Sequence, residues 1–129
     1  MAYEIDTLDV SFLCATDLSS SQYTYVKISA DNTIAAATAA TDKIVGILQN
    51  KPKGDVTPCA ARVRLFGVSR LVASDTSCTY GTWVTATTGG KGVATTTPKD
   101  ILNGIVISGA TAGNELCTVF LTGPQTLSA

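Results

Sequence analysis

The second half of this 129-residue chain repeats the order of segments found in its first half. Both stretches, 26–67 and 84–123, pass through an apolar segment, a tight turn, a small-residue segment, a Gly-centred apolar segment, a loop and a last apolar segment. An offset of 58 positions places Val26 on Val84, Gly46-Ile47-Leu48 on Gly104-Ile105-Val106, and Cys59 on Cys117. Either a diverged duplication or a coincidence of β-barrel sequence patterns explains this order. Two copies are too few for a solenoid, which needs about three repeats to bury its faces, so the repeat favours one closed barrel or sandwich.

The segments within each repeat have the composition and the punctuation of strands. Residues 23–28 are rich in aromatic and β-branched side chains, as strands prefer. Asp31-Asn32 and Gly89-Gly90 are two-residue hairpin signals, because such turns need positive φ. Gly46 occupies a place where a bend or a close neighbour would exclude a side chain. We therefore predict an all-β fold: a small β-barrel or sandwich built from two similar halves, with 23–129 forming a single β domain.

Residues 1–22 lie outside the repeat and are predicted to form an extended N-terminal arm and linker. Apolar residues alternate with polar ones, which is typical of a half-buried strand, and the alternation slips by one position after Thr7. Such a slip indicates a bulge or a break. The segment is either an edge strand of the domain or an arm that pairs with a neighbour. As an arm it would place five side chains in contact with a capsid or another subunit: Tyr3, Ile5, Leu8, Val10 and Phe12.

The charge composition argues against several classes of partner. Nine Lys and Arg residues stand against ten Asp and Glu residues, which gives a net charge of −1. A nucleic-acid binder needs excess Lys and Arg to replace the counterions of the phosphates, and an anionic membrane needs a basic face. No segment approaches the ~20 apolar residues that span a bilayer, and the N-terminus lacks the order of a secretory signal. We expect no nucleic acid and no membrane as partner, and folding in a cytosol.

Catalytic chemistry is poorly supported by the residue types present. The chain has no histidine, which removes Ser-His-Asp and Cys-His catalysis and most catalytic metal sites. The sequence Gly89-Gly90-Lys91-Gly92 is not a phosphate-binding loop, because Gly92 stands where Ser or Thr should bind magnesium. We therefore predict that the protein is not an enzyme, with no catalytic, metal-binding or cofactor-binding residues and no cofactor.

The four cysteines show no C-x-x-C spacing. In a cytosol they would stay reduced and serve as small, half-buried apolar side chains. The main alternative is a disulfide between Cys59 and Cys117.

Arg62, Arg64 and Arg70 are the chain's only arginines and fall within nine positions. They form either a solvated strand face or a contact with a capsid or another subunit, because arginine is favoured at interfaces. Only 15% of residues are charged, and a small soluble monomer normally carries more charge on its surface. The remaining surface is therefore expected to contact other protein.

The order of segments from about residue 17 to residue 123 resembles the bacteriophage capsid decoration proteins, also called cement or head-stabilising proteins. The similarity lies in segments 17–28, 44–52, 63–69, 89–91, 103–106 and 119–121, most specifically in Val45-Gly46-Ile47-Leu48-Gln49-Asn50-Lys51-Pro52. This chain departs from the family by a longer N-terminal segment and by its cysteines. The resemblance implies a small β-barrel that binds the outside of an assembled phage capsid and stabilises it, usually as a homotrimer. It also implies the major capsid protein as partner and a place on the capsid exterior of the virion, after assembly in the host cytoplasm.

The alternative function is a carbohydrate- or surface-binding β module. In that case the aromatic residues near equivalent repeat positions would form a sugar platform: Tyr23, Tyr25, Tyr80 and Trp83.

Overall fold

The computed structural model describes residues 8–14, 16–53 and 59–126. Within these residues the fold is all-β, as predicted, and its one helical element is a single 3-10 turn, η1 (Thr88–Gly90). The strands are β1 (Leu8–Cys14), β2 (Tyr25–Ala30), β3 (Thr33–Ala36), β4 (Ile44–Leu48), β5 (Cys59–Val72), β6 (Trp83–Ala86), β7 (Gly92–Ala94), β8 (Ile101–Ser108), β9 (Leu116–Leu121) and β10 (Gln125–Thr126).

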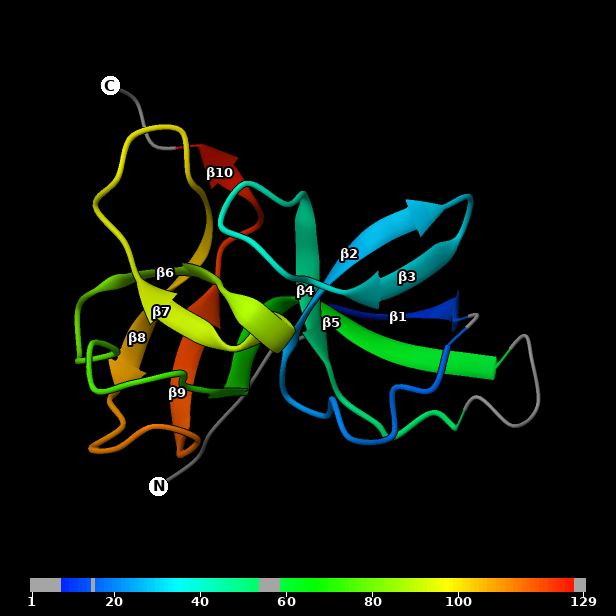
Figure 1. Ribbon diagram of the computed structural model, residues 1–129, viewed down its shortest axis with the longest axis horizontal. Coiled ribbons are helices and arrows are strands. Elements are labelled where there is room, and N and C mark those ends of the chain that lie inside the picture. The colour runs from blue at the N-terminus through cyan, green and yellow to red at the C-terminus, as the bar shows by residue number, and fades with distance from the viewer. Residues whose placement is uncertain (1–7, 15, 54–58, 127–129) are drawn as a thin grey trace.

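The strands form two lobes that lie side by side and share the long strand β5 (Figure 1). In the first lobe the order β1-β3-β2-β4-β5 closes into a five-stranded barrel, because β1 pairs with β5 as well as with β3. In the second lobe the order is β5-β9-β8-β6-β7, and a parallel bridge joins Ala73, just after β5, to Gly92 of β7. The two repeats seen in the sequence therefore occupy the two lobes, β2 to β5 in one and β6 to β9 in the other.

Strand β5 passes from one lobe to the other through a bend at Gly67. This glycine has a φ of +112°, a backbone conformation that side chains other than hydrogen disfavour. Before the bend β5 pairs with β1 and β4, and after it β5 pairs with β9 from Gly67 to Val72. The sequence pattern predicts a break at Gly67 and a separate strand after it. That prediction is wrong, because the strand bends and continues, and hydrogen bonding resumes on the other lobe.

Strand β1 belongs to the first barrel. It pairs antiparallel with β5 from Leu8 to Cys14, and its last two residues pair in parallel with β3. A register shift lies between Leu8 and Asp9, at the position next to the slip in the sequence alternation. Residues 1–7 of the proposed arm, including Tyr3 and Ile5, lie outside the described residues.

Two apolar clusters fill the lobes. The smaller one fills the first barrel, and Phe12 of β1 packs against it. The larger one fills the second lobe, but it also includes Tyr25 of β2, Ile44 and Ile47 of β4, and Ala37, which follows β3. The two lobes therefore share buried side chains as well as a strand.

The local predictions for turns and glycines agree with the structure in most respects. Asp31 and Asn32 connect β2 to β3 as a two-residue hairpin, with Asn32 at a φ of +53°. The second hairpin is wider than predicted, because η1 lies in its loop and Thr87 N–H donates to the Lys91 carbonyl. Gly46 is packed so closely that a Cβ there would lie 2.1 Å from the Arg64 carbonyl oxygen.

The cysteine predictions are wrong for one pair. Cys14 and Cys59 form a disulfide, with Cα atoms 5.3 Å apart. Cys59 and Cys117 are equivalent positions of the two repeats and lie in different lobes, so Cys117 is not the partner of Cys59. The pairing of β1 with β5 places Cys14 directly opposite Cys59, within the range a disulfide requires. Cys78 and Cys117 are free and buried, as small apolar side chains would be.

Candidate functional site

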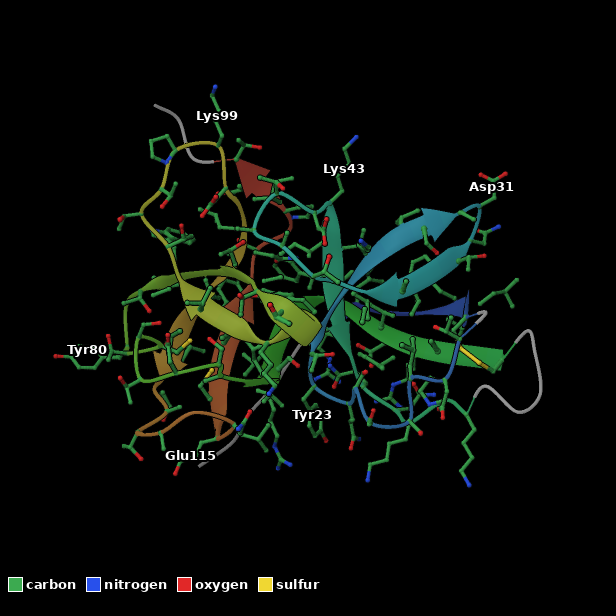
Figure 2. The ribbon with its side chains drawn as sticks, in the orientation of Figure 1. Tyr23, Asp31, Lys43, Tyr80, Lys99 and Glu115 are labelled. Atoms are coloured by element: carbon green, nitrogen blue, oxygen red, sulfur yellow. A yellow bond between two sulfur atoms is a disulfide. The ribbon has the colours of Figure 1, made fainter. Side chains whose placement is uncertain are left out.

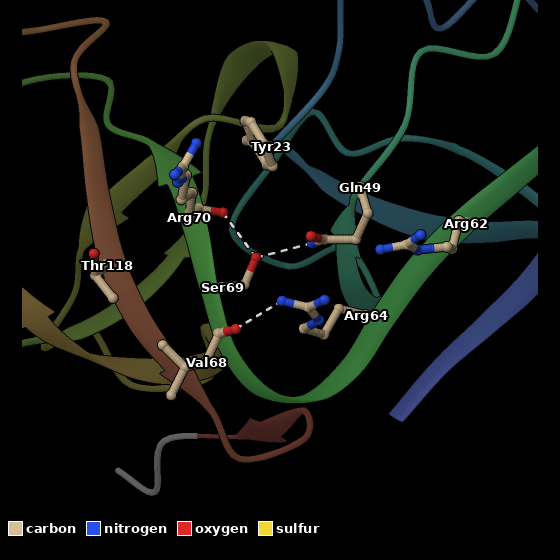
Figure 3. Close-up of a pocket in the computed structure, with 8 residues that line it drawn as sticks. All are labelled: Tyr23, Gln49, Arg62, Arg64, Val68, Ser69, Arg70 and Thr118. Carbon is tan, nitrogen blue, oxygen red and sulfur yellow. Dashed lines mark hydrogen bonds between the residues drawn. The ribbon is translucent and has the colours of Figure 1, made fainter. Parts of the chain in front are cut away.

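A polar pocket of about 400 Å³ lies on the outer face of the molecule where β5 bends (Figure 3). Its walls come from β5, from β9 and from the segments that flank β2 and β4. The lining residues are Tyr23, Gln49, Arg62, Arg64, Val68, Ser69, Arg70 and Thr118. All three arginines of the chain therefore line one pocket. Their spacing along a straight strand would place them on one face but would keep Arg70 far from Arg62, and the bend of β5 at Gly67 brings them together.

Arg64 is held in place by three contacts. Its Nε and Nη2 donate to the two carboxylate oxygens of Asp9, at 2.8 and 3.2 Å. Its Nη1 donates to the Val68 carbonyl at 2.8 Å, so the side chain spans the bend of the strand that carries it. Only 18% of the side chain is exposed. Arg64 therefore stabilises the curvature that makes the pocket concave.

Asp9 also accepts from Arg62, whose Nε lies 3.0 Å from the second carboxylate oxygen. The hydrogen bond from Arg64 and the nearby positive charges lower the pKa of Asp9 below its usual range, although burial opposes this. At neutral pH the Asp9 carboxylate is therefore ionised, and it accepts from the guanidinium groups of both Arg62 and Arg64. The Arg62 side chain remains 57% exposed, which leaves donors directed at solvent.

Arg70 lies on the other side of the pocket and is exposed. Its guanidinium carbon is 5.8 Å from the centre of the Tyr23 ring, within the range of a cation–π contact. Among the residues the structure describes, no carboxylate forms an ion pair with it. Of the three guanidinium groups that line the pocket, two pair with Asp9, and the third, Arg70, has no acidic partner in the described part of the chain.

Tyr23 is held in a strained backbone conformation at the edge of the pocket. Its φ is +64°, which is uncommon for a residue with a side chain and costs about 1–2 kcal/mol. Two hydrogen bonds maintain it: its N–H donates to the Leu48 carbonyl, and its carbonyl accepts from Val72 N–H, both at 2.8 Å. Strain of this kind persists where the surrounding structure enforces it, often at binding sites.

The floor of the pocket is a fixed polar network. Gln49 Nε2 donates to the Ser69 hydroxyl at 2.9 Å, and that hydroxyl donates to the Arg70 carbonyl at 3.0 Å. Ser69 is buried, and the network joins the residue after β4 to the second half of β5, which fixes the position of one strand relative to the other. The arrangement can bind and orient an anion.

Of the other predicted contact residues, Leu8, Val10 and Phe12 lie on β1, whereas Tyr3 and Ile5 lie outside the described residues. Leu8 faces outward and is 52% exposed. Val10 and Phe12 stand opposite Val63 and Ala61, which are buried, so these two side chains face the barrel interior. The register shift after Leu8 places it on the opposite face from them.

The aromatic residues of the alternative sugar platform do not share one surface. Tyr25 is fully buried, and its hydroxyl donates to the Asn103 carbonyl in the core. Tyr80 is 81% exposed and lies on the second lobe, at the far end of the molecule from the first barrel (Figure 2). Only Tyr23 lines the pocket.

Sequence reasoning missed Gln49 as a lining residue and Asp9 as the partner of Arg62 and Arg64, and it considered Tyr23 only for the sugar platform. The local pattern around each of them is ordinary strand or loop sequence. Asp9 reaches Arg64 because the two are register partners on strands 55 positions apart, and only the strand pairing reveals this.

Within the described ranges, no group of three His, Cys, Asp or Glu side chains could hold a metal ion. The same part of the chain contains no helix long and apolar enough to cross a membrane.

No protein-family model matches the chain, and no curated protein matches it. Among solved structures, the crystal structure of the head fiber gp8.5 N base in bacteriophage phi29 is similar, with a TM-score of 0.65 and 16% sequence identity. The match covers 91% of this chain and 95% of that chain. At this identity the similarity shows a shared fold. That fold belongs to a phage head protein, in agreement with the resemblance to phage capsid proteins found in the sequence.

Proposed function

We propose that this protein is a structural component of a bacteriophage virion, which binds the outer surface of the assembled capsid and stabilises it. The observation that carries the proposal is the fold shared with a phage head fiber base over nearly the whole of both chains. The low density of charge and the absence of histidine, noted from the sequence, suit a binding protein without catalysis.

The partner in this proposal is the major capsid protein, and the place of action is the capsid exterior after assembly in the host cytoplasm. A capsid presents the same surface many times over. Multivalent attachment turns weak single contacts into strong binding, so a small protein can stabilise a large shell without a large interface at each site.

The test is co-sedimentation of the purified chain with capsids that lack it. We expect the chain to pellet with the capsids up to a fixed number of copies, and the decorated capsids to withstand higher temperature than bare ones. Capsids of an unrelated phage serve as the control and should leave the chain in the supernatant. If the chain stays in solution with its own capsids at tens of micromolar, the proposal is wrong.

We further propose that the chain acts as a homotrimer, a state in which closed symmetry presents one binding surface three times. Each contact would need to bury about 800 Å² per partner for stable association. Light scattering after size-exclusion chromatography should give three times the 13.3 kDa of one chain. A mass of one chain at micromolar concentration contradicts a stable trimer in solution.

A further inference from the structure

We propose that the arginine pocket binds the carboxylate of an Asp or Glu side chain on a partner protein, while apolar residues beside that carboxylate pack on an adjacent stripe of exposed side chains. The inference rests on the proposed function, since it places the partner contact on one face of this chain.

The first argument is charge. The chain as a whole has a net charge of −1, yet three guanidinium groups line the pocket and only two of them pair with a carboxylate, that of Asp9, among the described residues. The Asp9 carboxylate pairs with the guanidinium of Arg64 and with the Nε of Arg62, while Arg70 has no acidic partner among the described residues. A carboxylate that entered the pocket would pair with Arg70 and with the exposed donors of Arg62, in the two-pronged geometry that guanidinium groups favour.

The second argument is that Arg70 is already positioned. Its guanidinium lies over the Tyr23 ring, and two backbone hydrogen bonds hold Tyr23 in its strained conformation. Because the ring restricts the arginine before a partner arrives, less side-chain entropy is lost on binding. Tyr23 acts in this way as a positioning residue for Arg70.

The third argument is the exposed stripe that begins at the wall of the pocket. Val68, which lines the pocket, stands opposite Phe120 on β9. The Phe120 and Phe66 rings pack edge to face with centroids 5.5 Å apart, although the two residues remain 36% and 45% exposed. Register pairs continue the row on both sides, so we define the apolar stripe as Leu8, Phe66, Phe120, Ile105 and Trp83, of which Ile105 is half-buried and the other four are exposed.

The stripe favours a protein partner over an acidic sugar. It crosses β1, β5, β9, β8 and β6, and five strands at their usual spacing span about 19 Å, the length of about six extended residues. Exposed aromatic side chains next to arginine are the composition of interface centres. A single acidic sugar would fill the pocket and leave this row of side chains in water.

The experiment titrates the full, isotope-labelled chain with two tripeptides that differ in one charge, acetyl-Phe-Glu-Phe-amide and acetyl-Phe-Gln-Phe-amide. Amide chemical shifts give the site and the dissociation constant. We expect the Glu peptide to shift the amides of Tyr23, Ser69, Arg70, Thr118 and Phe120 and to bind at least tenfold more tightly than the Gln peptide. The difference should shrink as salt is added.

The Arg70→Gln variant should reduce binding of the Glu peptide about tenfold and leave the spectrum of a folded protein. The Arg70→Lys variant, which keeps the charge and loses the planar head, should recover part of the affinity. Lys43→Gln removes one positive charge from an exposed loop residue on the other side of the molecule from Tyr23 (Figure 2) and should bind the peptide as the unchanged chain does.

Equal binding of both peptides, or shifts confined to another surface, would overturn the inference. So would preferential binding of N-acetylneuraminic acid at the pocket, which would make the ligand an acidic sugar. If Phe120→Ser converted an oligomer of this chain into a monomer, the stripe would be a contact between copies, and the inference would also fail.

Capsid co-sedimentation separates the two proposals. If the unchanged chain and Arg70→Gln pellet equally well with capsids, the virion function stands and the pocket is not the contact. If the Glu peptide binds as expected while no capsid is bound, the pocket assignment stands and the virion function fails.

Discussion

Asp9 is the residue on which the local geometry of the pocket depends. Its carboxylate accepts from Arg62 and Arg64, and the side chain is only 20% exposed. Replacing it leaves two guanidinium groups side by side without a counter-charge, and one of them is largely buried.

We expect Asp9→Asn to lower the free energy of unfolding by about 1–2 kcal/mol at neutral pH. Urea denaturation measures this loss, with Asp31→Asn in the exposed β2–β3 turn as the control expected to change little. No loss in Asp9→Asn would mean that its two ion pairs contribute nothing to stability.

The pH dependence follows from the lowered pKa of Asp9, whose ordinary value is 3.8. A carboxyl with a lower pKa in the folded state stabilises the fold fully above that ordinary value and loses this contribution as pH falls through the folded pKa. The stability gap between the unchanged chain and Asp9→Asn should therefore persist from pH 7 to about pH 4 and narrow below pH 4.

At the scale of the elements, the contact between β4 and β5 depends on a glycine. A Cβ at Gly46 would lie 2.1 Å from the Arg64 carbonyl oxygen and 2.9 Å from a Val63 methyl. The first of these atoms is backbone, so relief requires the strands to separate. Separation would open the first barrel and move Arg64 away from Asp9.

We expect Gly46→Ala to cost more than about 3 kcal/mol, as an overpacked core position does at the upper end. Gly81→Ala is the matched control, because a Cβ there meets nothing within 4 Å and adds only the strain of a positive φ, about 1–2 kcal/mol. Urea denaturation of both variants tests this. Equal losses would show that crowding at Gly46 is relieved without separating the strands.

At the scale of the whole molecule, two lobes of similar topology differ in their covalent constraint. The first barrel carries the Cys14–Cys59 disulfide, which closes a loop with a sequence separation of 45, and the second lobe has two buried free thiols. Both lobes depend on β5, and the larger core cluster contains residues of both repeats.

We therefore expect a single cooperative unfolding transition. Reduction of the disulfide should lower the midpoint of this transition, because a disulfide that closes a loop of this size stabilises the folded state by about 2–4 kcal/mol. The transition should remain single. Calorimetry with and without reductant measures both effects, and the Cys14→Ser/Cys59→Ser double variant should match the reduced protein. Two separate transitions would show that the lobes fold independently.

Three features could be predicted because each depends on residues that are neighbours in the sequence: the all-β class, the hairpin at Asp31-Asn32 and the close packing at Gly46. Alternation with period two, residues that tolerate positive φ and the lack of a side chain are local properties. The offset that relates the two repeats also anticipated the correspondence of the two lobes.

Only the tertiary structure decided which distant residues meet. Cys14 reaches Cys59, and Asp9 reaches Arg64, because β1 pairs with β5 in one register rather than another. Tyr23 reaches Arg70 because the chain before β2 is bonded to the second half of a strand that bends at Gly67. A strand's own sequence specifies which side chains share a face, while its neighbour and register are set by the packing of the whole barrel. The pocket consists of such pairings, so its arginines were visible in the sequence and its geometry was not.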